Sequence, residues 1–456
     1  MLGTGLRGLF ILILTWQLSA CGGSDDKEDS KKYDKPYLQF YNGSGGSGSV
    51  FLSVDEGSSA GSAVYGDATS VLTLDDNDVD LTFTEKDNDG VTHTLEELSV
   101  KVATGHKMLV VLSGQDSATT FNTYEIERTE LDKRFRLFAT SVLTSDQDYD
   151  VYLGESGSSF ANAHLLATVS ANQLEQFDSW QTEDTSSFSQ GEYQVYLTLP
   201  GEATPVFESS AIAFNYATEY TMIIRASSGA IKNNLEVDLV INSSSVNKYT
   251  STDEAAQYRI YNSLEERDVI VDVNGGQDNQ QQVTVPANAI SDFRAIVFGD
   301  YQLSGKVSDD DNLAFSNRLL TLSQGRSNAI VIYQDEEQNL VSLNFEESNL
   351  PQSVEHDIQV VNVNPDYDDL DIFFVRQNET ISTAKYRTQN LAFEHSARLT
   401  IKSGQYEIVM VHNDENNSPL LLARSEMLEI DQDVNYIVSL QASALSPSGY
   451  KIVLLH

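Results

Sequence analysis

One strand-turn-strand pattern occurs four times along the chain, and this repetition limits the fold more than any other feature. In each copy, a run rich in Val, Ile, Tyr and Phe is followed by a turn and a second such run. Repetition of this kind indicates that one supersecondary unit is used several times. The first runs are YLQFYN (37–42), RFRLFA (134–139), QYRIYN (257–262) and DIQVVN (357–362).

The runs are short, many alternate in polarity, and turn residues separate them at intervals of about 8–12 residues, which is typical of β-sandwiches. A Gly-x-Tyr entry also recurs before a later strand, at Gly191, Gly299 and Gly404. We therefore predict an all-β fold of about four tandem immunoglobulin-like antiparallel β-sandwich modules, arranged like beads in a row, each strand having one buried face. The predicted modules are 37–130, 131–247, 253–347 and 354–456, with short linkers at 243–247 and 348–352.

The N-terminal segment indicates export and lipidation. Arg7 is the only charged side chain before position 25, an apolar run follows at 10–14, and the segment ends in Leu18-Ser19-Ala20-Cys21. A cationic start, a short apolar run and small residues are typical of a secretory signal peptide, here 1–20. The ending resembles a bacterial lipobox, and Cys21 is the only Cys in the chain. We therefore predict lipidation at Cys21; the alternative is an ordinary signal peptide with an incidental Cys.

The same segment also predicts the cellular location of the protein. Gly22 stands where inner-membrane lipoproteins typically carry Asp, so the resemblance to bacterial lipoproteins favours the outer membrane. Residues 21–36 then form a lipidated Cys and a flexible tether, and no later run is apolar enough for a transmembrane helix. We expect a bacterial cell-envelope protein held to the membrane by its lipid, facing either the periplasm or the cell surface.

The charge excludes one class of partner. Lys and Arg total 28 against 68 Asp and Glu, so the net charge is −40. Nucleic-acid binding rests on cations that neutralise phosphates, so we expect no nucleic-acid partner. Without a second Cys, no intrachain disulfide can form, and stability has to come from packing.

The stretch EKDNDGVTHTLE (85–96) approaches a calcium-loop signature, with acidic residues two apart and Gly90 at the sixth position. Its flanks alternate as strands, and the corresponding stretches of the other copies, TLPGEA, VSDDDN and HNDENN, share only their turn-forming character. A β-hairpin turn is therefore the preferred interpretation. Asp87 and Asp89 remain the weaker alternative, as calcium candidates.

Other motif matches lack the context that their chemistry needs. Residues 43–48 spell G-x-G-x-x-G, but a strand follows where a dinucleotide site needs a helix. Residues 57–61 spell G-x-S-x-G in a β context, whereas a nucleophile elbow needs a strand-to-helix turn. The seven His residues form no H-x-x-x-H pair. We predict no cofactor, no catalytic residue and no enzymatic activity.

The strand with a terminal Asn, followed by a strand such as Asp268-Val269-Ile270-Val271, resembles an uncharacterised family of repeated β-sandwich domains in bacterial envelope lipoproteins. The resemblance implies fold and location and carries no catalytic residue. The expected function is to present tandem binding modules to an envelope protein or a glycan. The alternatives are a purely structural spacer and an enzyme of unrecognised type.

Overall fold

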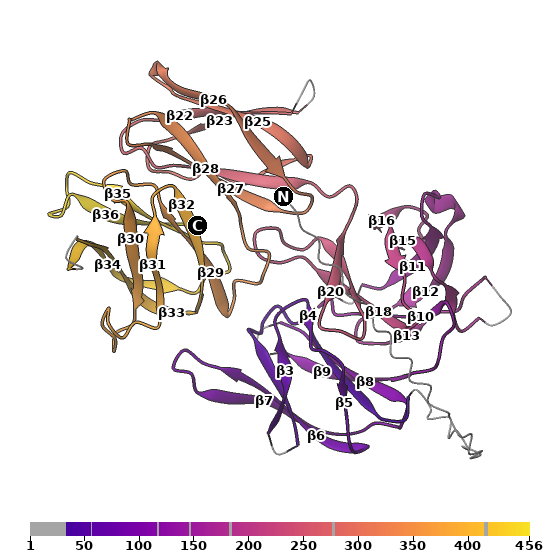
Figure 1. Cartoon of the computed structure of the whole chain (residues 1–456). Helices are drawn as coiled ribbons and strands as arrows, with labels where there is room; N and C mark the ends of the chain where they lie inside the picture. The colour runs from indigo at the N-terminus through magenta and orange to yellow at the C-terminus, as the bar shows by residue number, and fades with distance from the viewer. Residues whose placement is uncertain are drawn as a thin grey trace, which may run out of the picture.

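The computed structural model describes residues 33–456 except 56, 116–117, 146, 182–184, 276–278 and 415–417. In this part of the chain the strands form eight sheets, which face each other in pairs (Figure 1). Each pair is one β-sandwich, and the four sandwiches follow one another in sequence as modules 1 to 4. The predicted all-β fold of tandem immunoglobulin-like modules is confirmed.

Modules 3 and 4 share one strand order. In module 3, one sheet runs β24 (Arg294–Ile296), β21 (Ala256–Asn262), β27 (Ser327–Gln334), β28 (Leu340–Glu346), and the other runs β23 (Gln280–Val285), β22 (Val269–Asn274), β25 (Gly299–Val307), β26 (Asp310–Leu322). In module 4, the corresponding sheets are β32 (His395–Lys402), β29 (Glu355–Asn362), β35 (Ile437–Ala442), β36 (Tyr450–Leu455) and β31 (Tyr386–Ala392), β30 (Asp369–Val375), β33 (Gly404–Asn413), β34 (Pro419–Ile430).

Modules 1 and 2 follow the same order with split edge strands. Module 1 contains β4 (Asp67–Ala68), β5 (Leu72–Thr73), β1 (Tyr37–Asn42), β8 (His106–Ser113), β9 (Thr120–Glu127) and, facing them, β3 (Ser58–Ala63), β2 (Val50–Val54), β6 (Asp78–Lys86), β7 (Thr92–Lys101). Module 2 contains β13 (Glu175–Gln176), β14 (Phe188–Ser189), β10 (Arg134–Ser141), β18 (Glu219–Ala226), β19 (Leu235–Val240), β20 (Val246–Thr250) and, facing them, β12 (His164–Val169), β11 (Tyr149–Glu155), β15 (Gly191–Thr198), β16 (Pro205–Glu208), β17 (Ile212–Phe214); a 3₁₀ turn lies at Phe160–Asn162.

Each module contains one parallel strand pair, while its other paired strands are antiparallel, as predicted. The first strand of every module lies parallel to a strand near the end of the module: β1 to β8, β10 to β18, β21 to β27, and β29 to β35. Parallel neighbours need a long crossover connection. Here the strands of the facing sheet supply that connection, which closes the sandwich.

The recurring Asn at the end of the first strand has a structural role. Asn262 is fully buried, accepts a hydrogen bond from the Leu264 N–H, and donates to three backbone carbonyls around the next two strands. Asn42 and Asn362 make the corresponding contacts. In module 2 the pairing with β18 places Ser141 in this position, where its Oγ accepts from the Leu143 N–H. The sequence alignment of 134–139 with 37–42 was therefore wrong by two residues.

The Gly-x-Tyr entries form tyrosine corners, in which a Tyr hydroxyl binds the backbone a few residues upstream. Tyr193 donates to the Ser189 carbonyl at 2.7 Å, and Tyr406 donates to the Lys402 carbonyl at 2.7 Å. Tyr301 contacts the Val297 carbonyl in the same way. The motif therefore fixes how the chain enters the strand.

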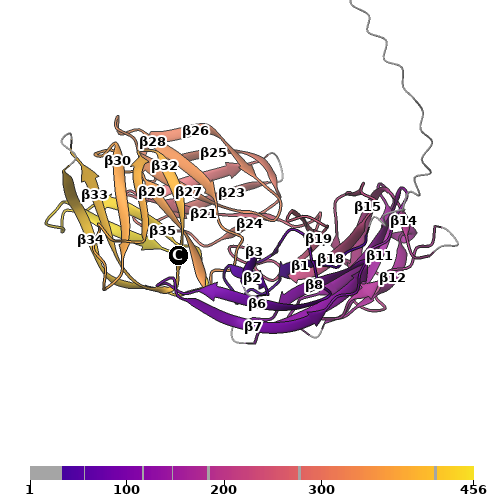
Figure 2. The same cartoon turned by 60° about the horizontal axis from the view of Figure 1, so that its bottom comes forward.

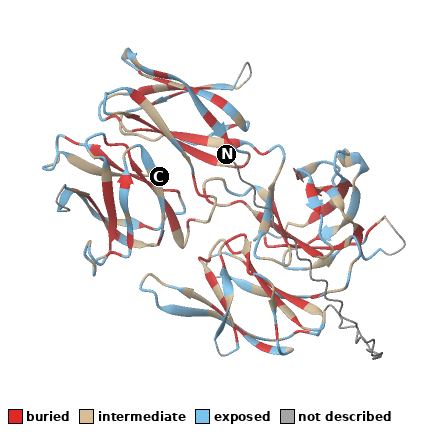
Figure 3. Cartoon of the chain, in the orientation of Figure 1, coloured by how far each residue is buried: buried red, intermediate tan, exposed pale blue. Residues whose placement is uncertain are grey.

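The modules pack against one another in pairs instead of forming a row of separate beads. Tyr41, Leu109 and Val111 of module 1 form one buried cluster with Phe138 and Ile223 of module 2. A second cluster joins modules 3 and 4 through side chains that include Tyr261, Val331, Val361 and Ile437. Strands β8, β10, β18 and β27 are consequently buried on both faces (Figure 3), which corrects the expectation of one buried face. Their continuous apolar runs are the signature of such burial.

The two pairs also contact each other through the segments that join the modules. The predicted linker at 243–247 runs into β20, which pairs with β19. In the second predicted linker, Ser348 is buried, and its carbonyl accepts from the Ala230 N–H of module 2 at 3.0 Å. Lys232 of module 2 lies 2.6 Å from Asp433 of module 4. The two predicted linkers are therefore packed against module 2 and are not free connections.

Candidate functional site

A long hairpin formed by β6 and β7 extends from module 1 towards module 4 (Figure 2). Its turn contains the predicted calcium candidates, and the prediction of a hairpin is confirmed. Gly90 has a φ of 81°, a left-handed conformation that Gly adopts without steric cost. The turn therefore presents residues 87–89 at its tip, against module 4.

Asp87 stabilises the turn from within. Its Oδ1 atom accepts hydrogen bonds from the backbone N–H groups of Asp89 and Val91, both at 2.9 Å. Its Oδ2 atom lies 2.8 Å from Nε2 of His93. The contact with His93, followed by the one with Val91, lowers the pKa of Asp87. The carboxylate is thus engaged by protein donors on both oxygens.

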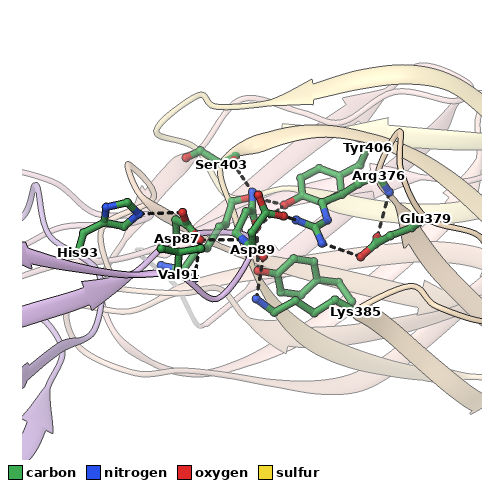
Figure 4. A network of polar contacts seen from close by, with 12 residues as sticks. Asp87, Asp89, Val91, His93, Arg376, Glu379, Lys385, Ser403 and Tyr406 are labelled. Carbon is green, nitrogen blue, oxygen red and sulfur yellow. Dashed lines mark hydrogen bonds and ion pairs between the residues drawn. The ribbon is translucent and has the colours of Figure 1, made fainter.

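Asn88 and Asp89 contact a group of module 4 residues that we call the notch, namely Arg376, Lys385, Tyr386, Ser403 and Tyr406. Figure 4 shows this contact, with Asp89, Arg376, Lys385, Ser403 and Tyr406 labelled. The Oδ1 atom of Asn88 accepts a hydrogen bond from the Tyr386 hydroxyl at 2.9 Å and lies 3.1 Å from the hydroxyl oxygen of Tyr406, whose proton is directed to the Lys402 carbonyl. Its Nδ2 group donates to the Ser403 carbonyl at 2.8 Å, and its backbone carbonyl accepts from Lys385 Nζ at 3.0 Å. The side-chain amide therefore has partners for its donor and for its acceptor, all in the notch.

Asp89 adds an ion pair beside this insertion. Its Oδ1 atom lies 2.6 Å from Nη1 of Arg376, whose Nη2 donates to Glu379 at 2.8 Å. The contacts with Glu379 and Asp89 raise the pKa of Arg376 despite its desolvation. The absence of a side chain at Gly404 also matters, because a Cβ there would lie 3.0 Å from Asn88 Nδ2. The notch is thus complementary to the hairpin tip in shape and in charge.

Calcium binding by Asp87 and Asp89 stays an untested prediction, but the contacts engage the Asp87 carboxylate within the turn and the Asp89 carboxylate at the joint with module 4. Within the described ranges, no group of three or more His, Cys, Asp or Glu side chains is arranged to hold a metal ion. Sequence reasoning identified the hairpin and missed its partners. No local signal links Asn88 to Tyr406, which lies 318 residues later.

The other sequence candidates fall at different places. Cys21, the predicted lipidation site, lies outside the described residues. The Gly-rich loop at 43–48 is followed by strand β2, and the Gly45 carbonyl accepts from Ser353 Oγ at 2.8 Å, so this loop forms part of the same joint. Ser59 lies within strand β3. In the described part of the chain, no helix is long and apolar enough to cross a bilayer.

A cleft of about 430 Å³ lies between modules 3 and 4, and it is the clearest candidate for a ligand site. Its walls are the loop after the first strand of each module, 263–267 and 363–366, together with 334–338 and the end of β35 at 440–442. The volume falls within the range of about 300–1,000 Å³ that is usual for ligand sites. The cleft exists only because the two modules pack together.

The cleft combines acidic and amide groups. Glu265, Glu266, Asp335 and Asp366 line it, together with a single cation among its described lining residues, Arg267. Arg267 is also 3.4 Å from Asp309 and from Asp310. At its floor, Gln441 contacts the hydroxyl of buried Tyr261. Such a surface suits a polar or cationic group.

Comparisons with known proteins add little to this description. No family model matches the sequence, and no curated protein does. Among solved structures, the crystal structure of BcpA, the major pilin subunit of Bacillus cereus, has 8% sequence identity and a TM-score of 0.14. The similarity covers 69% of this chain and 99% of that chain. With so low a TM-score, it gives no basis for transferring an arrangement or a function.

Proposed function

We propose that the protein is a non-enzymatic, lipid-anchored protein of the bacterial envelope that binds a protein or glycan partner. Cys21 would carry the lipid, the tether would hold the body near the membrane, and the outer membrane is the expected location. The observation that supports binding most directly is the cleft between modules 3 and 4, because residues of both modules line it.

The packing of the modules supports a binding body over a purely structural spacer. A spacer gains reach when its modules stand in line, whereas here sheet faces are buried between modules 1 and 2 and between modules 3 and 4. The hairpin of β6 and β7 further joins module 1 to module 4. This packing shortens the body and fixes the loops of two modules around one cleft.

The anchor is tested by metabolic labelling with palmitate. We expect label in the wild-type protein and none in the Cys21→Ser variant, because Cys21 is the only thiol in the chain. Equal labelling of the two proteins would contradict the anchor. Fractionation of the envelope then tests the outer-membrane location, and protease added to intact cells distinguishes surface display from periplasmic display.

The cleft is tested by placing a photo-reactive amino acid at Glu265 or Gln338 in the full-length protein in cells. Both positions line the cleft and are exposed, and the exposed Glu96 on β7 serves as the matched control. We expect one discrete crosslinked product from each cleft position and none from position 96. Loss of the added mass on treatment with glycosidase identifies the partner as a glycan, and peptides foreign to this chain in a digest of the product identify it as a protein. Identical products from all three positions, or none from the cleft, would refute the proposal.

A further inference from the structure

Lys107 is a buried amine at the junction of modules 1 and 2. It lies on β8, and its side chain is fully buried. Its Nζ atom donates to Asn242 Oδ1 at 2.9 Å and to Gln39 Oε1 at 3.2 Å. Asn242 belongs to module 2 and follows β19. The contact therefore joins an amine of one module to a carboxamide of the next.

Gln39 fixes the segment that carries Asn242. Its Nε2 group donates to the carbonyls of Ile241 and Ser243, at 2.8 Å and 3.0 Å. These two residues flank Asn242, so its backbone is held on both sides from module 1. The orientation of its side chain towards Lys107 is consequently built into the junction.

Glu219 is the third member of this cluster. It is fully buried on β18, and its Oε2 atom accepts from Asn242 Nδ2 at 3.0 Å. The same Nδ2 group donates to Thr218 Oγ1 at 2.6 Å. Arg128 lies 3.4 Å from Glu219 Oε2, while Oε1 is buried without a hydrogen-bond partner among the described residues. A carboxyl group thus lies at the nitrogen atom that would have to leave Asn242.

We propose that Lys107 and Asn242 react to form an intramolecular amide bond that joins modules 1 and 2 covalently. The neutral Nζ atom attacks Cγ of Asn242, a new C–N bond forms, the bond between Cγ and Nδ2 breaks, and ammonia leaves. One proton passes from Nζ to the departing nitrogen, and Glu219 carries it as general base and then general acid. The step consumes no oxidant, reductant or other co-reactant.

The environment of Lys107 favours the neutral amine that this step requires. Burial lowers the pKa of Lys107 to about 8, although the charge of Glu219 acts in the opposite direction. A desolvated Lys is an activated nucleophile for the same reason. At neutral pH about one amine in ten is therefore uncharged. Because loss of ammonia is irreversible once it diffuses away, a small reactive fraction suffices.

The geometry selects Asn242 over Gln39 as the acceptor. The Nε2 group of Gln39 donates to backbone carbonyls, which cannot deliver a proton to a leaving amine. The Nδ2 group of Asn242 has the Glu219 carboxylate beside it. At the matching junction of modules 3 and 4, Ser327 stands at the strand register that Lys107 has in module 1, so the amine needed for this reaction is missing there. The bond is thus specific to the junction of modules 1 and 2.

Peptide mapping of the full-length protein tests the bond. Trypsin should leave peptides 102–128 and 233–248 joined through Lys107 and Asn242, with a mass equal to their sum less one ammonia molecule. The intact protein should weigh one ammonia molecule less than its processed, lipidated sequence. Recovery of unlinked peptides cut after Lys107 would overturn the proposal, and a link to the peptide containing Gln39 would overturn the choice of Asn242.

The peptide map of the wild-type protein decides whether the bond forms. Variants then test which side chains the reaction requires. Lys107→Arg keeps the charge and should abolish the joined peptide. Glu219→Gln keeps the shape of the side chain and should reduce the joined fraction at least tenfold in freshly made protein. A joined fraction equal to that of the wild type would overturn the role of Glu219. Circular dichroism of each variant shows whether it has folded.

Discussion

Asn42, Asn262 and Asn362 recur at the end of the first strand in the sequence, but only the structure shows the reason for this recurrence. Each is fully buried and joins the end of one strand to the two strands that follow. The repeated letter could be predicted to matter, but its partners are backbone carbonyls, which leave no trace in a sequence. For the same reason Ser141 of module 2, which accepts a similar bond, escaped the alignment.

Replacement of Asn262 by Ala should destabilise module 3 by about 3 kcal/mol, because carbonyls are left buried without donors and each costs about 1–3 kcal/mol. Thermal unfolding followed by calorimetry measures this loss. Asn312→Ala is the matched control, since Asn312 is exposed near the start of β26 in the same module and its side chain makes a hydrogen bond with Asp310 at 3.4 Å. Equal losses of stability in the two variants would show that the buried contacts of Asn262 contribute no more than those of an exposed Asn.

His356 should make the stability of module 4 depend on pH. Burial lowers the pKa of His356 below 6.5, although Asp431, Asp433 and Asp357 act against this. The unfolded chain therefore takes up a proton at a higher pH than the folded chain. The contribution is complete above pH 6.5 and is lost as the pH falls towards the folded pKa, by about 1.4 kcal/mol for each unit of difference.

Calorimetry from pH 7.5 to 5 tests this dependence. The melting temperature of the wild type should fall across this range more steeply than that of His356→Gln, which cannot titrate. The variant itself should be less stable at pH 7.5, since it alters the contact with Ser403 Oγ at 2.9 Å. Parallel curves for the two proteins would exclude His356 as the source of the dependence.

At the scale of the strands, features with a local sequence signal could be predicted, whereas contacts between distant segments could not. The hairpin of β6 and β7 was predictable, because alternating flanks and a turn with Gly90 are local signals. The apolar runs at 108–112 and 329–332 also carried a signal for burial on both faces, which the assumption of separate modules concealed. The notch that receives Asn88 was not predictable, since its residues lie on loops and strands about 290–320 positions later.

Replacement of Asn88 by Ala should loosen the contact between modules 1 and 4. The Tyr386 hydroxyl loses its acceptor and the Ser403 carbonyl loses a donor, so the cost is about 1–3 kcal/mol. Hydrogen exchange should become faster in residues 85–92 and around 403–406, with little change in module 3. Asn312→Ala, beside the corresponding turn of module 3, again serves as control and should leave the exchange of both segments unaltered.

The number of modules in the whole molecule could be predicted, but their arrangement could not. A repeat reveals itself within the sequence, whereas packing between modules depends on pairs such as Tyr41 with Asp238, or Lys232 with Asp433, that are about 200 residues apart. A high net negative charge opposes such packing by self-repulsion. The junctions overcome this repulsion locally, because Lys107, Arg225 and Arg376 lie there among acidic or amide groups.

Zero-length coupling with a carbodiimide tests this arrangement on the full-length protein. The reagent joins an amine to a carboxylate only when the two are in contact, and Lys232 lies 2.6 Å from Asp433 with both side chains partly exposed. Lys101 and Asp78, 3.3 Å apart within module 1, are the control pair that reacts in any arrangement of folded modules. We expect both products by mass spectrometry, and Lys232→Arg should remove only the first. If the control product forms while the link between modules 2 and 4 does not, the modules stand apart, because a row of beads would leave Lys232 and Asp433 without contact.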